Sequence, residues 1–424
     1  MKGFLLVLLA AVAYAKHEEY IGLKSYYVSP SSMDQVKVLS AMVPQFDLDF
    51  ISKIRLNHQG VVLVKPHYQA GFSKALAEKN IHFKVSTVDV KTQLDIDDAR
   101  MEKQKAARTN ETMSYDNYQT IEVIDKYLQD IAEEFSDIAT LVVPAESFEG
   151  HPIQYLKISS TNFEDSSKPI IFINSGMNAR EWIGPPTVTY AIHKLVEEIT
   201  EGEEDLLEKF DWILLPVVNP DGYKYTSRRF WHKNRSTNQH PLSRLCPGVD
   251  IDMNFDFFWN NFGTSENPCN DNFPGGEAFS EVETRVVRDI LLQYQRRITL
   301  YMSMHSYGSY VLYPWGHDGS LSAGAFALHT VGINIVDAIH EKALENFRRY
   351  VVGNSVLVTN TQTSGSSEDY AHDLGIPLTY DIELPGLDLG LEGFHLAPEY
   401  IQQVVEETWA GIVVGARRSG ELFG

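Results

Sequence analysis

Residues 170–183 read IIFINSGMNAREWI, and this stretch decides how the rest of the chain is interpreted. Its apolar half, residues 170–173, is rich in isoleucine and is typical of a buried strand. The polar half places Asn178 three residues before Glu181. An Asn and a Glu at this spacing form no metal-binding motif by themselves, so their meaning depends on the segments around them.

The first 15 residues have the features of a secretory signal peptide. Lys2 precedes an apolar run at residues 4–12, and residues 13–15 form a small-x-small cleavage site. The run is too short to span a bilayer, and no later stretch of about 18 uncharged apolar residues occurs. The chain is therefore expected to be secreted and extracellular, without membrane association.

The charge and the cysteine content indicate which partners to exclude and whether a disulfide is expected. The formal net charge of −21 argues against nucleic acids and anionic membranes as partners. The two cysteines, Cys246 and Cys269, should form a disulfide in an oxidising compartment. Closing a loop of this length stabilises a fold by about 3 kcal/mol in the chain-entropy model. Sequons at Asn110 and Asn234 permit N-glycosylation.

Residues 16–108 are predicted to form a small α+β pro-domain with an activation linker. Strands are expected at 26–28, 61–64 and 82–85, and amphipathic helices at 31–42 and 68–79. The charged run at 95–108 contains neither glycine nor aromatic residues. It is either an ordinary surface helix or a helical connector, and its position between two domain-like blocks favours a connector. Lys105 and Arg108 would then be offered to a trypsin-like activating protease.

Residues 109–424 are predicted to form one large α/β domain. Apolar runs at 170–173, 212–218, 299–304 and 378–384 are expected to be its central strands, with helices between them. Ser280 and Glu283 have capping-box spacing at the start of a helix expected over 280–295.

Several segments, in order along the chain, carry a resemblance to a known family. They are residues 176–183, 219–223 (NPDGY), 229–231 (RFW), 233–235 (KNR), 248–250 (GVD), 300–308 (LYMSMHSYG) and 382–384 (IEL). Together they resemble the metallocarboxypeptidase A/B family of secreted zinc procarboxypeptidases. The resemblance covers nearly the whole chain and implies an α/β/α domain with a mixed central sheet, preceded by a small α+β pro-domain.

The family's chemistry assigns roles to positions that this chain retains. Zinc with two imidazole ligands and one carboxylate polarises the scissile carbonyl and activates water, and a nearby Glu takes the proton. By resemblance, Glu181 and His305 are metal ligands and Glu383 is the base. Residues implied in substrate binding are Arg180, Ser306 and Tyr307.

Other positions depart from the family pattern. The replacements are Asn178 for the first His ligand, His232 for the oxyanion-stabilising Arg, Asp252 and Met253 for the Asn-Arg pair that clamps the substrate carboxylate, Thr361 for the mobile Tyr, and Glu368 at the floor of the side-chain pocket.

These replacements predict weakened catalysis. An amide oxygen is a poor zinc ligand, so zinc is expected to be weakly bound or absent. His232 is shorter than Arg, and Met253 cannot pair with a carboxylate, whereas a clamping Arg would bind it in a bidentate manner. We therefore predict a catalytically inactive or strongly impaired protein.

The retained and substituted carboxylates suggest a ligand. Asp252, Glu368, Glu383 and Glu181 would face one cavity, and such a cluster is unfavourable without a neutralising cation or shifted protonation. A peptide or small cationic ligand is the expected partner, and the protein is expected to be a monomer. Two alternatives stay open. One is an active zinc metallocarboxypeptidase that removes C-terminal, possibly basic, residues, and the other is a purely structural or storage protein.

Overall fold

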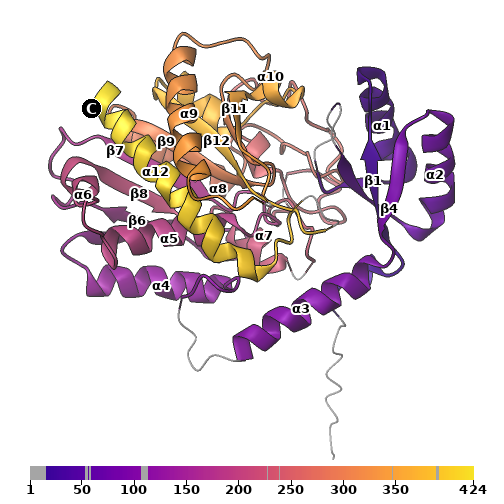
Figure 1. Ribbon diagram of the computed structural model, residues 1–424, viewed down its shortest axis with the longest axis horizontal. Coiled ribbons are helices and arrows are strands. Elements are labelled where there is room, and N and C mark those ends of the chain that lie inside the picture. The colour runs from indigo at the N-terminus through magenta and orange to yellow at the C-terminus, as the bar shows by residue number, and fades with distance from the viewer. Residues whose placement is uncertain are drawn as a thin grey trace, which may run out of the picture.

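The structure is a computed structural model. It describes residues 16–52, 56, 59–106, 113–226, 228–237, 239–345, 347–387 and 391–424. The predicted signal peptide, Arg108 and the sequon at Asn110 lie outside these residues. Figure 1 shows a small domain beside a large one, with a long helix passing from the first towards the second.

The small domain is the expected α+β unit. Its four-stranded sheet has the order β2-β3-β1-β4, and the neighbouring strands are antiparallel. The elements are η1 (Glu18–Tyr20), β1 (Lys24–Ser29), α1 (Met33–Phe46), β2 (Asp49–Phe50), β3 (Gly60–Val64), η2 (Pro66–Tyr68), α2 (Gln69–Glu78) and β4 (His82–Thr87). The three predicted strands and two predicted helices are confirmed, with ends that differ by a few residues.

The connector is helix α3 (Val90–Ala106). It leaves the small domain and runs towards the large domain (Figure 1). Near its middle, α3 contacts both domains, because Asp98 pairs with His17 at 2.9 Å and Arg100 approaches Glu399 of the large domain at 3.5 Å.

The large domain is built on an eight-stranded mixed sheet of order β11-β10-β12-β9-β7-β8-β6-β5. Neighbours are parallel from β12 through β9 and β7 to β8, and β6 and β10 run antiparallel to the strands beside this parallel centre. The strands are β5 (Ala139–Glu146), β6 (Pro152–Ile158), β7 (Ile170–Ser175), β8 (Asp211–Leu215), β9 (Ile298–Ser306), β10 (Tyr310–Tyr313), β11 (Val351–Asn354) and β12 (Leu378–Leu384). The four predicted central strands are β7, β8, β9 and β12.

Helices cover both faces of this sheet, which confirms the predicted α/β/α class. Successive residues of β7 point to opposite faces: Ile171 and Ile173 pack in one apolar cluster with α4, α5, α9 and α12, whereas Ile170 and Phe172 pack in another with α8 and α11. The helices are α4 (Ile121–Glu134), α5 (Gly184–Val196), α6 (Asp205–Lys209), α7 (Pro220–Tyr225), η3 (Ile251–Met253), α8 (Val282–Tyr294), α9 (Ala325–His340), α10 (Ser355–Thr359), α11 (Ser367–Asp373), η4 (Pro398–Tyr400) and α12 (Ile401–Phe423).

Two local predictions have opposite outcomes. The Cys246–Cys269 disulfide is present, with the Cα atoms 4.7 Å apart. The sequon at Asn234 is wrong as a glycosylation site, because its side chain is fully buried and donates to Glu281 at 2.6 Å.

The capping box predicted at Ser280 and Glu283 is also wrong. Helix α8 begins at Val282, and its N-cap residue, Glu281, makes no side-chain capping bond. Glu283 is fully buried instead and accepts a 3.3 Å hydrogen bond from Asn234. The capping-box spacing therefore does not produce a cap here, because Glu283 is buried against a segment that is distant in the sequence.

The buried Glu283 predicts a pH-dependent stability. Burial, followed by the neighbouring Glu281 carboxylate, raises the pKa of Glu283 from 4.5 to about 8. Because the folded chain retains a proton that the unfolded chain has lost, this group's contribution is complete below pH 4.5 and declines as the pH rises to about 8. The expected loss is on the order of a few kcal/mol, at roughly 1.4 kcal/mol per pKa unit. In urea unfolding at pH 5 and pH 8, Glu283→Gln should lose less stability than the natural chain; parallel losses would contradict the prediction.

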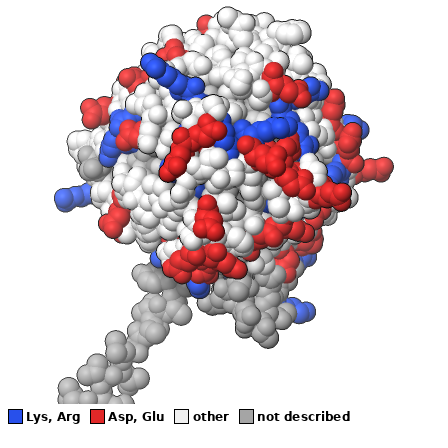
Figure 2. Space-filling view, turned by 90° about the vertical axis from the view of Figure 1, so that its left-hand side faces the viewer, with Lys and Arg blue, Asp and Glu red and all other residues white. Residues whose placement is uncertain are grey.

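The surface carries both signs of charge. On the face seen in Figure 2, Lys and Arg are interspersed with Asp and Glu, so the net charge of −21 forms no single acidic field there. Among the described residues, no helix is long and apolar enough to cross a membrane.

Candidate functional site

The three expected metal-binding positions meet at the carboxyl ends of β7 and β9. Asn178 and Glu181 lie in the turn after β7, and His305 lies near the end of β9. Asn178 Nδ2 donates to Glu181 Oε1 at 3.0 Å, and His305 Nδ1 lies 3.0 Å from Glu181 Oε2. All three side chains are buried. The structure therefore brings these predicted site residues together.

His305 is held from both sides of its ring. Its Nε2 lies 2.9 Å from Ser303 Oγ and 3.8 Å from Asp252 Oδ2. Ser303 in turn donates to Asn174 Oδ1 at 3.0 Å. Burial opposes protonation of His305, but the Asp252 and Glu181 carboxylates prevail and raise its pKa well above the ordinary value.

The donor set fits zinc poorly. A catalytic zinc site in a protein takes three ligands from His, Cys, Asp and Glu and keeps an open position. Here the group offers one imidazole, one carboxylate and the amide of Asn178. An amide oxygen is a hard and weak donor that suits calcium or magnesium better. The residues at this place therefore lack one ligand of the kind that zinc requires.

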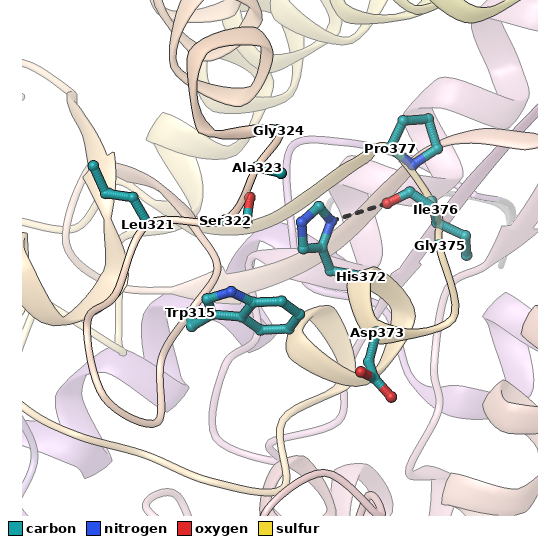
Figure 3. A pocket seen from close by; sticks show the side chains of 10 residues that line it. All are labelled: Trp315, Leu321, Ser322, Ala323, Gly324, His372, Asp373, Gly375, Ile376 and Pro377. Carbon is teal, nitrogen blue, oxygen red and sulfur yellow. Dashed lines mark hydrogen bonds between the residues drawn. The ribbon is translucent and has the colours of Figure 1, made fainter.

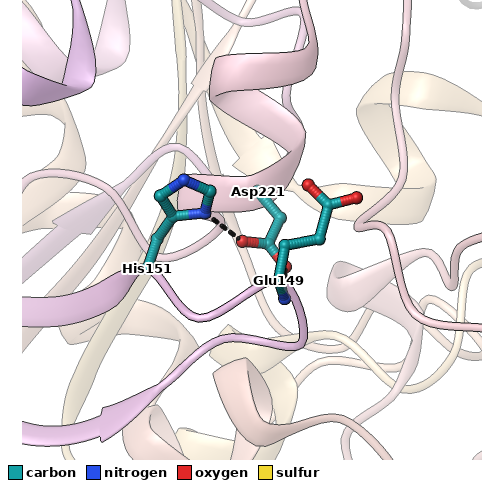
Figure 4. A group of neighbouring side chains, drawn as sticks. All are labelled: Glu149, His151 and Asp221. Carbon is teal, nitrogen blue, oxygen red and sulfur yellow. Dashed lines mark hydrogen bonds and ion pairs between the residues drawn. The ribbon is translucent and has the colours of Figure 1, made fainter.

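A different group has three potential metal ligands close together. Within the described part of the chain, Glu149, His151 and Asp221 are the one set of His, Cys, Asp or Glu whose ligand atoms all lie within 4.8 Å (Figure 4). Asp221 is already used, because it accepts from Glu149 N and faces His151 Nδ1, both at 2.7 Å. Glu149 Oε1 also accepts from Arg235 at 3.2 Å. These contacts link the β5–β6 turn to α7 and explain why the three side chains lie close together.

His232 is held by a carboxylate. Its Nε2 lies 3.2 Å from Asp250 Oδ2, and its backbone oxygen accepts from Ala179 N at 2.9 Å. His232 Nδ1 is buried without a hydrogen-bond partner among the described residues. The residue expected in place of the oxyanion Arg thus lies beside the turn that carries Asn178 and Glu181, with its ring held by Asp250, a contact that was not predicted from the sequence.

The expected clamp positions lie on η3. Asp252 Oδ1 is 3.5 Å from Ser367 N, at the start of α11, and its Oδ2 approaches His305. Met253 is half-buried and uncharged. A carboxylate and a thioether therefore occupy the place where the family pattern has an amide and a guanidinium.

Glu368 lies on α11 with only 5% of its surface exposed. Its Oε2 has no hydrogen-bond partner among the described residues. Burial first, and then the carboxylates of Asp252, Asp381 and Asp369, raise the pKa of Glu368 well above its ordinary value. Asp381 is a neighbour that the sequence analysis missed. Its position two residues before Glu383 was the available signal, since alternate residues of a strand share a face.

The other predicted residues are divided between the site and its surroundings. Glu383 is buried and pairs in register with His305 across β12 and β9. The expected base is therefore next to the group formed by Asn178, Glu181 and His305. Ser306 N donates to Glu181 Oε2 at 3.2 Å. The ring of Tyr307 meets Phe394 edge-on at 5.1 Å. Thr361 forms hydrogen bonds with Thr359, the last residue of α10, and among the described residues none joins it to the other predicted site residues.

The small domain reaches this site. Arg180 Nη1 lies 3.6 Å from Asp49 of β2 and 3.3 Å from Asp271. Around this pair, small-domain residues share one apolar cluster with the large-domain residues Phe230, Leu391 and Phe394. Arg180, which the resemblance implies in substrate binding, is therefore engaged by the small domain.

A pocket of about 490 Å³ lies elsewhere, between the loop before α9 and the turn from α11 to β12 (Figure 3). His372 Nδ1 donates to Ile376 O at 3.0 Å, and its ring meets that of Trp315 at 5.0 Å. None of the predicted site residues lines this pocket.

Family models match most of the chain. A model described as zinc carboxypeptidase matches residues 124–411, and one described as carboxypeptidase activation peptide matches residues 26–97. The chain is 58% identical to a carboxypeptidase B of Helicoverpa zea over 429 aligned residues, covering all of both chains.

Solved structures agree with these matches. The crystal structure of a carboxypeptidase A from Helicoverpa armigera has a TM-score of 0.90 at 39% identity, covering 96% of this chain and 99% of that one. Bovine thrombin-activatable fibrinolysis inhibitor, solved in complex with tick carboxypeptidase inhibitor, has a TM-score of 0.65 at 29% identity, covering 72% and 99%.

Proposed function

This chain belongs to the zinc carboxypeptidase family, and from that premise we propose that it binds the end of a peptide, or a small cationic molecule, at a carboxypeptidase-type site whose hydrolytic power is strongly reduced. The observation that carries the proposal is the donor set of Asn178, Glu181 and His305, which has one imidazole and one carboxylate. Zinc, which the family implies, would be held weakly by these residues. When bound, it would supply polarisation of the scissile carbonyl.

Two further replacements support reduced hydrolysis. His232 is fixed on Asp250, so its ring does not have the reach or the fork of donors that an Arg offers to a developing oxyanion. Met253 provides no partner for a substrate carboxylate. Glu383 still lies beside His305, but a base alone cannot replace the metal and the oxyanion donors.

A cationic ligand follows from the charges at the site. Glu368 is buried with one oxygen unpartnered in the described structure, and Asp252 and Asp381 are its acidic neighbours. A basic side chain or an amine would neutralise these carboxylates and donate hydrogen bonds to them.

The small domain is proposed to cover the site until the connector is cut. Asp49 engages Arg180, and the apolar cluster around Phe230 and Phe394 joins the two domains. A trypsin-like protease that cuts the chain between α3 and α4 would remove the covalent link between the two domains. We also propose that residues 1–15 direct secretion.

A second candidate function is hydrolysis of C-terminal basic residues. The 58% identity to a carboxypeptidase B supports this candidate better than it supports a binding protein. Glu181, His305 and Glu383 are retained and lie together, which also favours it. Asn178, His232 and Met253 are the residues that speak against it.

Glu383→Gln separates the two candidates. If hydrolysis is lost, trypsin-treated protein supplied with zinc should release C-terminal arginine from a peptide no faster than the same preparation of Glu383→Gln. The readout is free arginine over time, with binding of the peptide measured in parallel. A rate that falls at least 100-fold in Glu383→Gln would establish enzymatic turnover, and the second candidate would replace the first.

A further inference from the structure

The carboxylates of Asp252, Glu368 and Asp381, called here the acidic cluster, come from three separate segments. Asp252 lies on η3, Glu368 on α11 and Asp381 on β12. The contact between Asp252 Oδ1 and Ser367 N joins η3 to the beginning of α11. In the sheet, Asp381 is in register with Ser303, which contacts His305. The acidic cluster therefore lies next to the group formed by Asn178, Glu181 and His305.

One carboxylate oxygen of the acidic cluster is buried without a hydrogen-bond partner among the described residues. Glu368 is about nineteen-twentieths buried, at 5% exposure, yet its Oε2 accepts no hydrogen bond from any described residue. A buried polar atom without a partner is unfavourable, and more so when it is charged. A guest with N–H donors and a positive charge would satisfy that oxygen and relieve the repulsion among the three carboxylates.

The same residues are unfavourable for a guest that carries its own carboxylate. Asp252 and Met253 occupy the positions where the family pattern holds the substrate's terminal carboxylate. A carboxylate brought there would meet the Asp252 anion, and Met253 offers it no donor. Charge therefore selects against the free C-terminus that a carboxypeptidase substrate must have.

Building on the proposed function of the site, we propose that the acidic cluster binds organic cations without a free carboxylate. Its ligands are amines, guanidines or peptides that end in an amidated basic residue. An amide in place of the terminal carboxylate removes the repulsion by Asp252 and leaves the basic side chain free to reach Glu368.

Three probes that share a guanidinium group test this selectivity. They are Nα-acetyl-arginine, which has a free carboxylate, Nα-acetyl-argininamide, which has an amide instead, and agmatine, which has neither. Binding is measured by calorimetry with a chelator present, on the full chain before and after limited trypsin treatment, and the tighter-binding form is used. We expect argininamide and agmatine to bind at least ten-fold more tightly than acetyl-arginine.

Variants assign the effect to the cluster. Glu368→Gln should weaken all three probes at least ten-fold, whereas Asp252→Asn should bring acetyl-arginine closer to argininamide. Glu208→Gln, which removes one exposed carboxylate on α6, is the charge-matched control and should change nothing. Equal or tighter binding of acetyl-arginine would overturn the inference and leave the proposed cationic site intact. Failure of all three probes to bind either form would overturn both.

Discussion

Replacing Asn178 by His is expected to raise the zinc affinity of the protein at least 100-fold. Glu181 and His305 already lie 3.0 Å apart, and Asn178 contacts both of them, so an imidazole at position 178 would complete a set of two His and one Glu. Loss of supporting groups around a metal site typically costs 10–100-fold in affinity. Loss of a direct ligand should cost more.

The measurement is zinc per chain by elemental analysis after dialysis against trace zinc, with the dissociation constant from competition with a chelating dye. Asn178→His should retain one zinc under conditions where the natural chain retains little. Zinc at about 100 times the dissociation constant should also stabilise the variant by roughly 2.7 kcal/mol, which thermal unfolding can detect without any activity assay. Asn178→Ala is the matched control and should resemble the natural chain. One tightly held zinc in the natural chain would refute the prediction.

Much of the fold could be predicted from the sequence because its signals are local. The run at 170–173 is apolar on both faces, which indicates a strand buried between two helix layers, and its residues divide between the two apolar clusters. The pairing of Cys246 with Cys269 needed only a count of cysteines. The burial of Glu283 against Asn234 could not be read in this way, because it depends on how residues far apart in the chain pack.

The same distinction between local signals and long-range packing applies to the site. The order of the motifs indicated which positions would meet, and Asn178, Glu181 and His305 do meet. The contacts that decide how the site behaves were missed. Asp250 fixing His232 and Asp49 engaging Arg180 join segments that are separate in the chain. Sequence order supplies the residues of a site, but the charge partners of each residue follow from packing.

The largest change in hydrolysis is expected from His232→Arg in a background that already carries Asn178→His, Asp252→Asn and Met253→Arg. The background restores the ligand set and the carboxylate clamp, and it leaves the developing oxyanion without a strong donor. In the structure the His232 ring is bound to Asp250 at 3.2 Å, whereas an Arg is longer and offers five N–H donors.

Removing one oxyanion donor from an enzyme typically lowers kcat by about 10²–10³-fold, so supplying one should raise kcat by a similar factor. The assay is release of C-terminal arginine from a peptide by the trypsin-treated variants with zinc present, with kcat and KM determined separately. A gain in kcat with little change in KM identifies transition-state stabilisation. His232→Gln in the same background retains a hydrogen-bond donor without the positive charge and should gain little. If the background alone hydrolyses the peptide as fast as the variant with Arg, then His232 bound to Asp250 already serves the oxyanion, and this replacement does not account for weakened catalysis.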